Sequence, residues 1–263
     1  MLTGDLPLWW IAILIVAAFA AGWVDAVSGG GGLIQLPVML LALPPSLVIS
    51  GLGTNKLSSM IGTSAAAATY ARRSPPDPRT ALPMAGAAFI GSAMGAAAAT
   101  RVPPEAFRPV VAAVLLIVWV WTLLRPAMGE TDNLRWGGRR RHYVVAVALG
   151  FVIGCYDGLI GPGTGAFLVF VLVWLLGYSF LRASATAKVV NLGTNIAALI
   201  VFAIAGHVLW GLGLLMGAGN LAGGVLGART AVRRGSGFVR TVLLAVVGVL
   251  IVVLLIQSIL VLR

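Results

Sequence analysis

The chain has 263 residues, of which 60% are hydrophobic and only 10% are charged, and its formal net charge is +11. Soluble domains carry about 25% charged residues, so the composition excludes that class and indicates an integral membrane protein. The apolar runs are continuous and roughly 17–25 residues long, which favours helices over the short alternating strands of a membrane barrel. The positive charge is better explained by arginine in loops than by binding of nucleic acid, and no nucleic-acid partner is expected.

Ten apolar segments follow in chain order, five in each half, and most are separated by stretches rich in proline, glycine, serine or arginine. Those of the first half are residues 8–27, 33–49, 52–71, 81–100 and 107–125. Those of the second half are residues 142–160, 165–181, 184–206, 209–229 and 239–262. The first two segments of each half are either two spans or a broken, re-entrant hairpin. We therefore expect eight to ten transmembrane helices.

The two halves repeat one another at an offset of 132 residues. Asp25 recurs as Asp157, and Lys56 recurs as Lys188. Further matches at this offset pair Gly22 with Gly154, Thr54 with Thr186, Met84 with Met216, Arg101 with Arg233, and Arg108 with Arg240. Chance is a poor account of matched acids, lysines and arginines, so the sequence predicts a tandem duplication: a first repeat (1–125), a linker (126–141) and a second repeat (142–263).

An odd number of crossings in each half inserts the two halves in opposite orientations. The predicted fold class is therefore an all-α inverted-repeat transporter. Most arginines, those of the linker included, fall on one side of the membrane under this topology. The rule that positive loops stay inside makes that side cytoplasmic, so we expect a cell inner-membrane protein with a cytoplasmic linker and both termini outside.

Four ionisable groups fall at or near membrane depth: Asp25, Asp157 and the only two lysines of the chain, Lys56 and Lys188. Left unpaired, each costs about 2.5–3.5 kcal/mol at a helix centre, or roughly 10–14 kcal/mol for the four. They must be paired, hydrated or close to an interface, and pairing of aspartate with lysine is the least costly arrangement. Two interpretations follow: ion pairs that hold half-helices together, or charges that surround a central aqueous site.

A glycine-rich run follows each aspartate, and neither run is expected to form stable helix. Non-helical backbone at membrane depth survives only where it is buried in protein or lines a cavity. An apolar helix follows each run, so the backbone N–H groups at its start are expected to form an anion site that the helix dipole assists. The candidate residues are Gly29, Gly30, Gly31, Gly32, Gly161, Gly163, Thr164 and Gly165.

A polar stripe marks the lysine segments. Lys188, Asn191 and Asn195 are spaced three and then four residues apart, which places them on one helix face. Such a stripe in an apolar segment suits a solvated substrate path, although hydrogen bonding between helices is an alternative for the repeat mates Ser59 and Thr63. The neighbouring candidates are Thr54, Asn55 and Thr186.

Three motifs together resemble a known family: Gly22-x-x-Asp25-x-x-x-Gly29-x-Gly31-Gly32, then Gly53-Thr54-Asn55-Lys56, then Ala185-Thr186-Ala187-Lys188-Val189-Val190-Asn191. They are similar to those of the TauE/SafE sulfite exporter family of small bacterial membrane transporters, and the resemblance covers nearly the whole chain. It implies movement of a small sulfur-containing anion, such as sulfite or an organosulfonate, usually outward. The second glycine run is less glycine-rich than the first, so the two sites need not be equivalent.

The expected function is a secondary transporter that works by alternating access between its two repeats. The sequence has no Walker motif, so ATP is not expected to be the direct energy source. Lys56 and Lys188 would supply charge to the anion, while Asp25 and Asp157 would orient the lysines or carry a coupling proton. The glycine-run amides would donate hydrogen bonds, and the shell would be completed by Thr54, Asn55, Thr186, Asn191 and Asn195. The expected partners are the lipid bilayer, the anion and, with coupling, protons. No cofactor or metal is expected, and the chain would act as a monomer or homodimer.

A passive anion channel is the alternative function, since the same site could conduct. An intramembrane aspartyl protease is a remote one, because two membrane aspartates sharing a proton could activate water. The segment Gly22-Trp23-Val24-Asp25 lacks the glycine–x–glycine–aspartate context of that class, and a protease leaves the paired lysines unexplained. No enzymatic activity is therefore expected.

Overall fold

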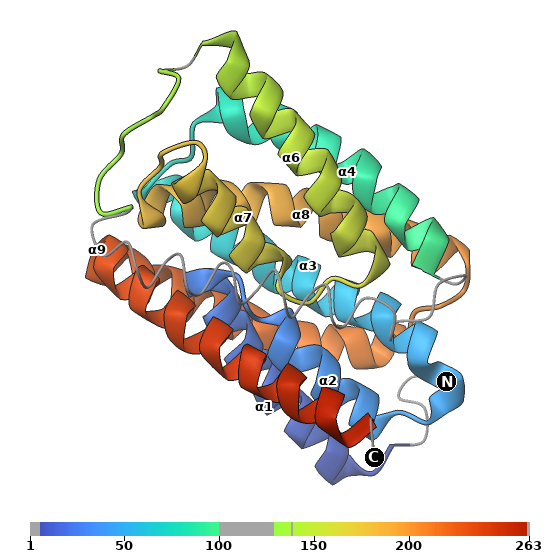
Figure 1. The fold of residues 1–263 in the computed structure, drawn as a ribbon. Coiled ribbons are helices and arrows are strands. Elements are labelled where there is room, and N and C mark those ends of the chain that lie inside the picture. The colour runs from blue at the N-terminus through green and yellow to red at the C-terminus, as the bar shows by residue number, and fades with distance from the viewer. Residues whose placement is uncertain (1–5, 100–128, 138, 262–263) are drawn as a thin grey trace.

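The computed structural model describes residues 6–99, 129–137 and 139–261, and all regular structure in these ranges is helical (Figure 1). The helices are α1 (Leu8–Ser28), α2 (Gly32–Ala42), the short 3-10 helix η1 (Pro45–Leu47), α3 (Val48–Arg73), α4 (Pro78–Ala99), α6 (Arg140–Leu159), α7 (Thr164–Trp174), α8 (Phe180–Ile204) and α9 (Trp210–Val261). Among these, α1, α4, α6, α8 and α9 are long and apolar enough to cross a membrane. The fold is that of an all-α, multi-pass membrane protein.

The distribution of side chains fits a lipid environment. Lys56, Lys188 and Asp157 are buried inside the bundle, whereas large apolar residues such as Val152 and Ile204 are exposed on its outside. A protein in water would pay to expose such apolar surface, while a protein in lipid gains from it and hides its polar groups.

The second predicted segment of each half is a half-length helix rather than a full span. α2 and α7 have 11 residues each, which gives about 16 Å at 1.5 Å per residue, against about 30 Å of bilayer hydrocarbon. Proline at positions 44 and 45 stops α2, and Gly177 with φ 83° follows α7. α2 and α7 are therefore too short to cross on their own, whereas α1 and α6, which precede them, are long enough to cross.

The last two predicted segments, 209–229 and 239–262, are joined in the structure. α9 runs through both, and the expected loop between them is reduced to a kink at Gly235, whose φ of 77° and ψ of −172° are not helical. Only glycine adopts this conformation without strain, so a single residue makes the break. The predicted segment 107–125 lies outside the described residues.

Glycines bring the long helices into close backbone contact. A Cβ on Gly91 of α4 would collide with the carbonyl of Phe151 in α6, and one on Gly223 of α9 would collide with the carbonyl of Phe19 in α1. The residues of the two contacts are 132 positions apart, so the same contact occurs once in each half. Close packing of this kind is how helices associate in lipid, where apolar burial gives no driving force.

Candidate functional site

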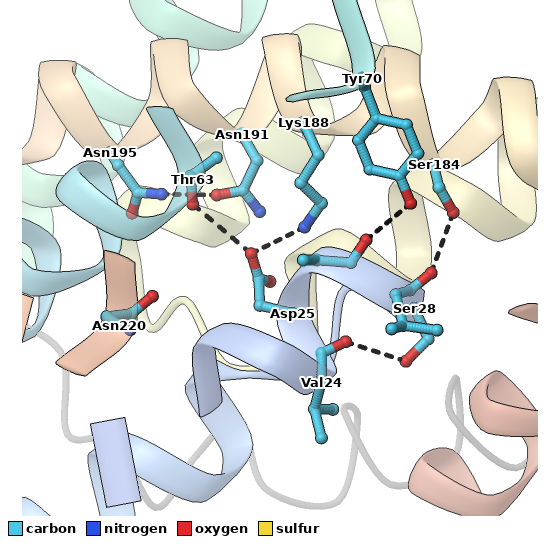
Figure 2. Close-up of polar contacts among 12 residues, drawn as sticks. Val24, Asp25, Ser28, Thr63, Tyr70, Ser184, Lys188, Asn191, Asn195 and Asn220 are labelled. Carbon is cyan, nitrogen blue, oxygen red and sulfur yellow. Dashed lines mark hydrogen bonds and ion pairs between the residues drawn. The ribbon is translucent and has the colours of Figure 1, made fainter. Parts of the chain in front are cut away.

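Two buried ion pairs cross between the halves of the chain. The Lys56 Nζ, two turns into α3, lies 2.8 Å from the Asp157 Oδ2 in the last turn of α6, and it also donates to the Asp157 carbonyl oxygen at 2.7 Å. The Lys188 Nζ, at the matching place in α8, lies 2.7 Å from the Asp25 Oδ2 in α1 (Figure 2). Each lysine thus pairs with the aspartate of the other half, which balances the four charges.

The end of α1 is held in place by side chains of α3 and α8. Gly29 adopts a left-handed φ of 83° and donates its N–H to the Asp25 carbonyl, which ends the helix. The Tyr70 hydroxyl donates to the Ala26 carbonyl at 2.9 Å, and the Ser184 hydroxyl donates to the Val27 carbonyl at 3.2 Å. These bonds satisfy carbonyls that a helix end leaves unpaired, and they aim Asp25 between α3 and α8 (Figure 2).

The glycine-rich runs between α1 and α2 and between α6 and α7 are the two breaks in the helices, and the second is built differently from the first. Gly161 and Gly163 both have left-handed φ, 90° and 85°, and the run between α6 and α7 is tied down by two hydroxyls. The Tyr156 hydroxyl donates to the Pro162 carbonyl at 2.5 Å, and the Thr164 hydroxyl donates to the Gly161 carbonyl at 2.7 Å. Both runs are thus held by two hydroxyls, but two residues of the second run and only one of the first adopt positive φ.

The two breaks and the two lysine helices surround one small polar cavity of about 20 Å³, which is room for about one water molecule. Its lining residues are Asp25, Gly29, Gly32, Asn55, Lys56, Ser59, Thr63, Asp157, Gly161, Gly163, Thr164, Gly165, Asn191 and Asn195. Twelve of these fourteen are residues that the sequence singles out as site candidates, and the other two, Ser59 and Thr63, belong to the polar stripe. Glycine backbone, amides and charged groups thus meet in one place.

Some candidates lie behind the cavity wall. The Thr54 hydroxyl donates to the Ser50 carbonyl at 2.6 Å and accepts the Leu209 N–H at 2.9 Å, so it ties α3 to the start of α9. Thr186 is fully buried and its hydroxyl has no partner among the described residues. The cavity lining does not include Gly30, Gly31, Thr54, Thr186 or Lys188. Lys188 reaches the cavity through its bond to Asp25.

Two further polar residues were missed by the sequence reasoning. The Asn220 Nδ2 of α9 donates to the Gln35 Oε1 of α2 at 2.6 Å, and both side chains are buried. A Cβ on Gly22 or Gly62 would collide with Asn220, so this side chain is wedged between α1 and α3. The sequence does mark both residues, because each is an amide side chain in an otherwise apolar segment. The comparison of the two halves does not select them, because neither has a polar residue at the matching position.

The two ion pairs differ in their access to the cavity. The side chain of Asp157 is 3% exposed, whereas that of Asp25 is 17% exposed and also accepts the Thr63 hydroxyl at 3.4 Å. Asn191 and Asn195 share an amide hydrogen bond of 2.5 Å beside Asp25 (Figure 2). Among the described residues, no group of three histidine, cysteine, aspartate or glutamate side chains could hold a metal ion.

Broken half-length helices that meet at a buried, charged cavity define a multi-pass membrane protein of the transporter class. The chain belongs to the family described as sulfite exporter TauE/SafE, which it matches over residues 14–254. No solved structure matches the chain.

Three relatives carry transporter names. A "probable membrane transporter protein ORF9" of Sinorhizobium sp is 39% identical over 243 residues, covering 92% of this chain and 91% of the relative. A "probable membrane transporter protein" of Haemophilus influenzae is 32% identical and covers 88% of both chains. The "probable membrane transporter protein YfcA" of Escherichia coli is 32% identical, covering 94% of this chain and 90% of the relative. The chain is thus a membrane transporter and not an enzyme.

Proposed function

We propose that the chain is a secondary transporter of a small sulfur-containing anion, sulfite or an organosulfonate, which binds in the cavity between the two glycine breaks. The observation that carries this proposal is that Lys56 lines the cavity together with glycine backbone of both breaks. Lys188 lies one hydrogen bond away from the cavity, because it donates to Asp25 in the cavity lining. Ammonium groups and glycine N–H groups are donors that suit an oxyanion. The family description names sulfite, which fits these donors.

The aspartates give the site a means of coupling. With both ion pairs closed, the four groups carry no net charge, and a bound anion would add an uncompensated negative charge at membrane depth. Protonation of Asp25 would release the Lys188 ammonium to the anion, and a singly charged anion would then leave the site with no net charge. Asp25 is better placed for this step than Asp157, because its side chain is the more exposed.

Alternating access would come from an inverted repeat of residues 1–125 and 142–263. The crossed ion pairs and the twice-used contacts of Gly91 with Phe151 and of Gly223 with Phe19 support this relation. Rocking of one repeat against the other would open the cavity to each side in turn. The linker 126–141 would be cytoplasmic, both termini outside, and the transport direction outward across the inner membrane.

Flux of sulfite and of a simple organosulfonate into proteoliposomes tests the proposal. Lys56→Ala and Lys188→Ala should each abolish flux, while Arg73→Gln, which removes an exposed charge at the end of α3, should leave it unchanged. Size-exclusion profiles and melting curves would check folding. Flux at the wild-type rate in both lysine variants would remove the lysines from the mechanism. Flux that neither saturates nor shows counterflow would identify a passive channel instead.

A further inference from the structure

We propose that α9 carries a binding site for the headgroup of an anionic phospholipid, separate from the central cavity and independent of the transported substrate. The site is a surface hollow lined by Arg229, Arg233 and Arg234, with Leu226 and Thr230 beside them. Arg229 and Arg233 are exposed to the surroundings of the protein.

The arginines continue an apolar helix face. Leu215, Leu226, Arg229 and Arg233 are spaced by 11, 3 and 4 residues, which keeps them on one side of a helix with 3.6 residues per turn. Leu215 and Leu226 are 42% and 46% exposed. Acyl chains lying along this face would bring their headgroup to the arginines.

The depth of the arginines also fits a headgroup. Trp210 begins α9 and is 53% exposed, as suits a residue at one membrane interface. Arg233 lies 23 residues further along, or about 34 Å at 1.5 Å per residue, and the bilayer hydrocarbon is about 30 Å thick. On this measure Arg233 reaches the level of the lipid phosphates on the other side, and Arg229, about one turn earlier, lies at the edge of the hydrocarbon.

Within the part of the chain that the structure describes, the charge of the hollow is not compensated by an acid. No described carboxylate forms an ion pair with Arg229, Arg233 or Arg234. The Arg234 guanidinium lies over the Phe238 ring at 5.1 Å, and the Thr230 hydroxyl donates to the Leu226 carbonyl of its own helix. Arginine forks match phosphate oxygens, and basic pockets at the membrane surface bind anionic headgroups.

The repeat does not require an arginine at position 229, whereas Arg233 does have an arginine, Arg101, at the matching position of the sequence. At the 132-residue offset, Arg229 and Thr230 correspond to Ala97 and Ala98 of α4, which occupy the matching place in the other half. Arg72 and Arg73 at the end of α3 offer a useful contrast. They too are exposed, but the exposed residues before them are small ones such as Ala68, so they have no comparable face for acyl chains.

The test compares Arg229→Gln/Arg233→Gln with the control Arg72→Gln/Arg73→Gln, which loses the same charge. In detergent, phosphatidylglycerol should raise the melting temperature of the wild type and the control. Its apparent affinity for the Arg229/Arg233 variant should be at least tenfold weaker, and phosphatidylcholine should shift none of them. Equal phosphatidylglycerol shifts in both variants would overturn the proposal.

Two further measurements test the lipid site in the wild-type protein itself. Inorganic phosphate should produce no shift at the same concentration, since a shift equal to that of phosphatidylglycerol would identify a free-anion site rather than a lipid site. Native mass spectrometry of the wild type, purified from an equal mixture of the two lipids, should show enrichment of phosphatidylglycerol. Equal retention of both lipids would contradict a headgroup site even if the variants failed to fold.

Discussion

Gly29 and Gly165 are the residues at which the glycine breaks of the two halves touch. A Cβ on Gly165 would lie 2.5 Å from the Gly29 Cα, and the Gly29 carbonyl accepts the Ala166 N–H at 3.1 Å. The end of α1 and the start of α7 are therefore joined backbone to backbone beside the cavity. Rocking of one half against the other would therefore have to pivot about this contact or break it.

Gly165→Ala should destabilise the protein, because an added methyl group at this contact has no space unless the two breaks move apart. Overpacking of this kind costs about 1–3 kcal/mol, which should lower the melting temperature in detergent by several degrees. Gly86→Ala in α4 is the matched control, since its Cβ would meet nothing within 4 Å. Equal melting temperatures for the two variants would show that the contact is not tight.

The buried charges could be predicted from the sequence, but their partners could not. Asp25, Asp157, Lys56 and Lys188 stand out because lipid makes an ionised group within an apolar segment costly. Which lysine meets which aspartate depends on how α3 and α8 pack across the halves, and local sequence carries no record of that packing. The cross-half pairing is for this reason a finding of the structure.

Candidates chosen by nearness in sequence were less well placed. Thr54 lies two residues before Lys56, but the helix turns its hydroxyl toward Ser50 and Leu209 and away from the cavity. The predicted segment 33–49 is longer than α2 for a different reason. The apolar character of these residues outweighed the two prolines that follow the helix. Composition marks membrane segments well, while backbone breaks decide their length.

Lys56→Met should cost more stability than Lys188→Met. Removing Lys56 leaves Asp157 buried with no other side-chain partner among the described residues, whereas removing Lys188 leaves Asp25 with the Thr63 hydroxyl and partial exposure. An uncompensated buried charge costs about 3–5 kcal/mol. Melting curves of the two variants measure the difference.

The double variant Lys56→Met/Asp157→Asn serves as the control, because it removes both charges of the buried pair. It should recover a large part of the stability that Lys56→Met loses, since no unpaired charge stays inside. A double variant as unstable as the single one would show that the pair contributes packing and not charge balance.

Asp132 in the linker should stabilise α8 in a pH-dependent way. Its Oδ1 accepts the Ser179 N–H at 2.7 Å, and its Oδ2 lies 2.6 Å from the Arg182 Nη1. Burial raises the pKa of this carboxyl, but the hydrogen bond from Ser179 and the Arg182 guanidinium outweigh it and hold the pKa below the ordinary 3.8. The stabilisation is therefore complete above the unfolded-state pKa and is lost as the pH falls through the lower folded-state value.

Asp132→Asn should accordingly lower the melting temperature at pH 7, and its difference from the wild type should shrink as the pH is lowered below 4. Because the pair is partly exposed, the effect should be no more than about 1 kcal/mol. Glu130→Gln, an exposed change in the same linker, should have no effect at either pH. A difference that persists unchanged at pH 3 would contradict the role of the ionised carboxylate.

Asp25→Asn should separate anion binding from proton coupling, on the transport mechanism proposed above. Asparagine mimics the protonated aspartate, so the Lys188 ammonium would stay available to the anion and sulfite counterflow should persist. Accumulation driven by a pH gradient should be lost, because the side chain no longer exchanges a proton. Asp157→Asn, in the sealed pair with Lys56, should leave the response to the gradient in place. Gradient-driven accumulation by Asp25→Asn at the wild-type rate would show that the coupling proton travels elsewhere.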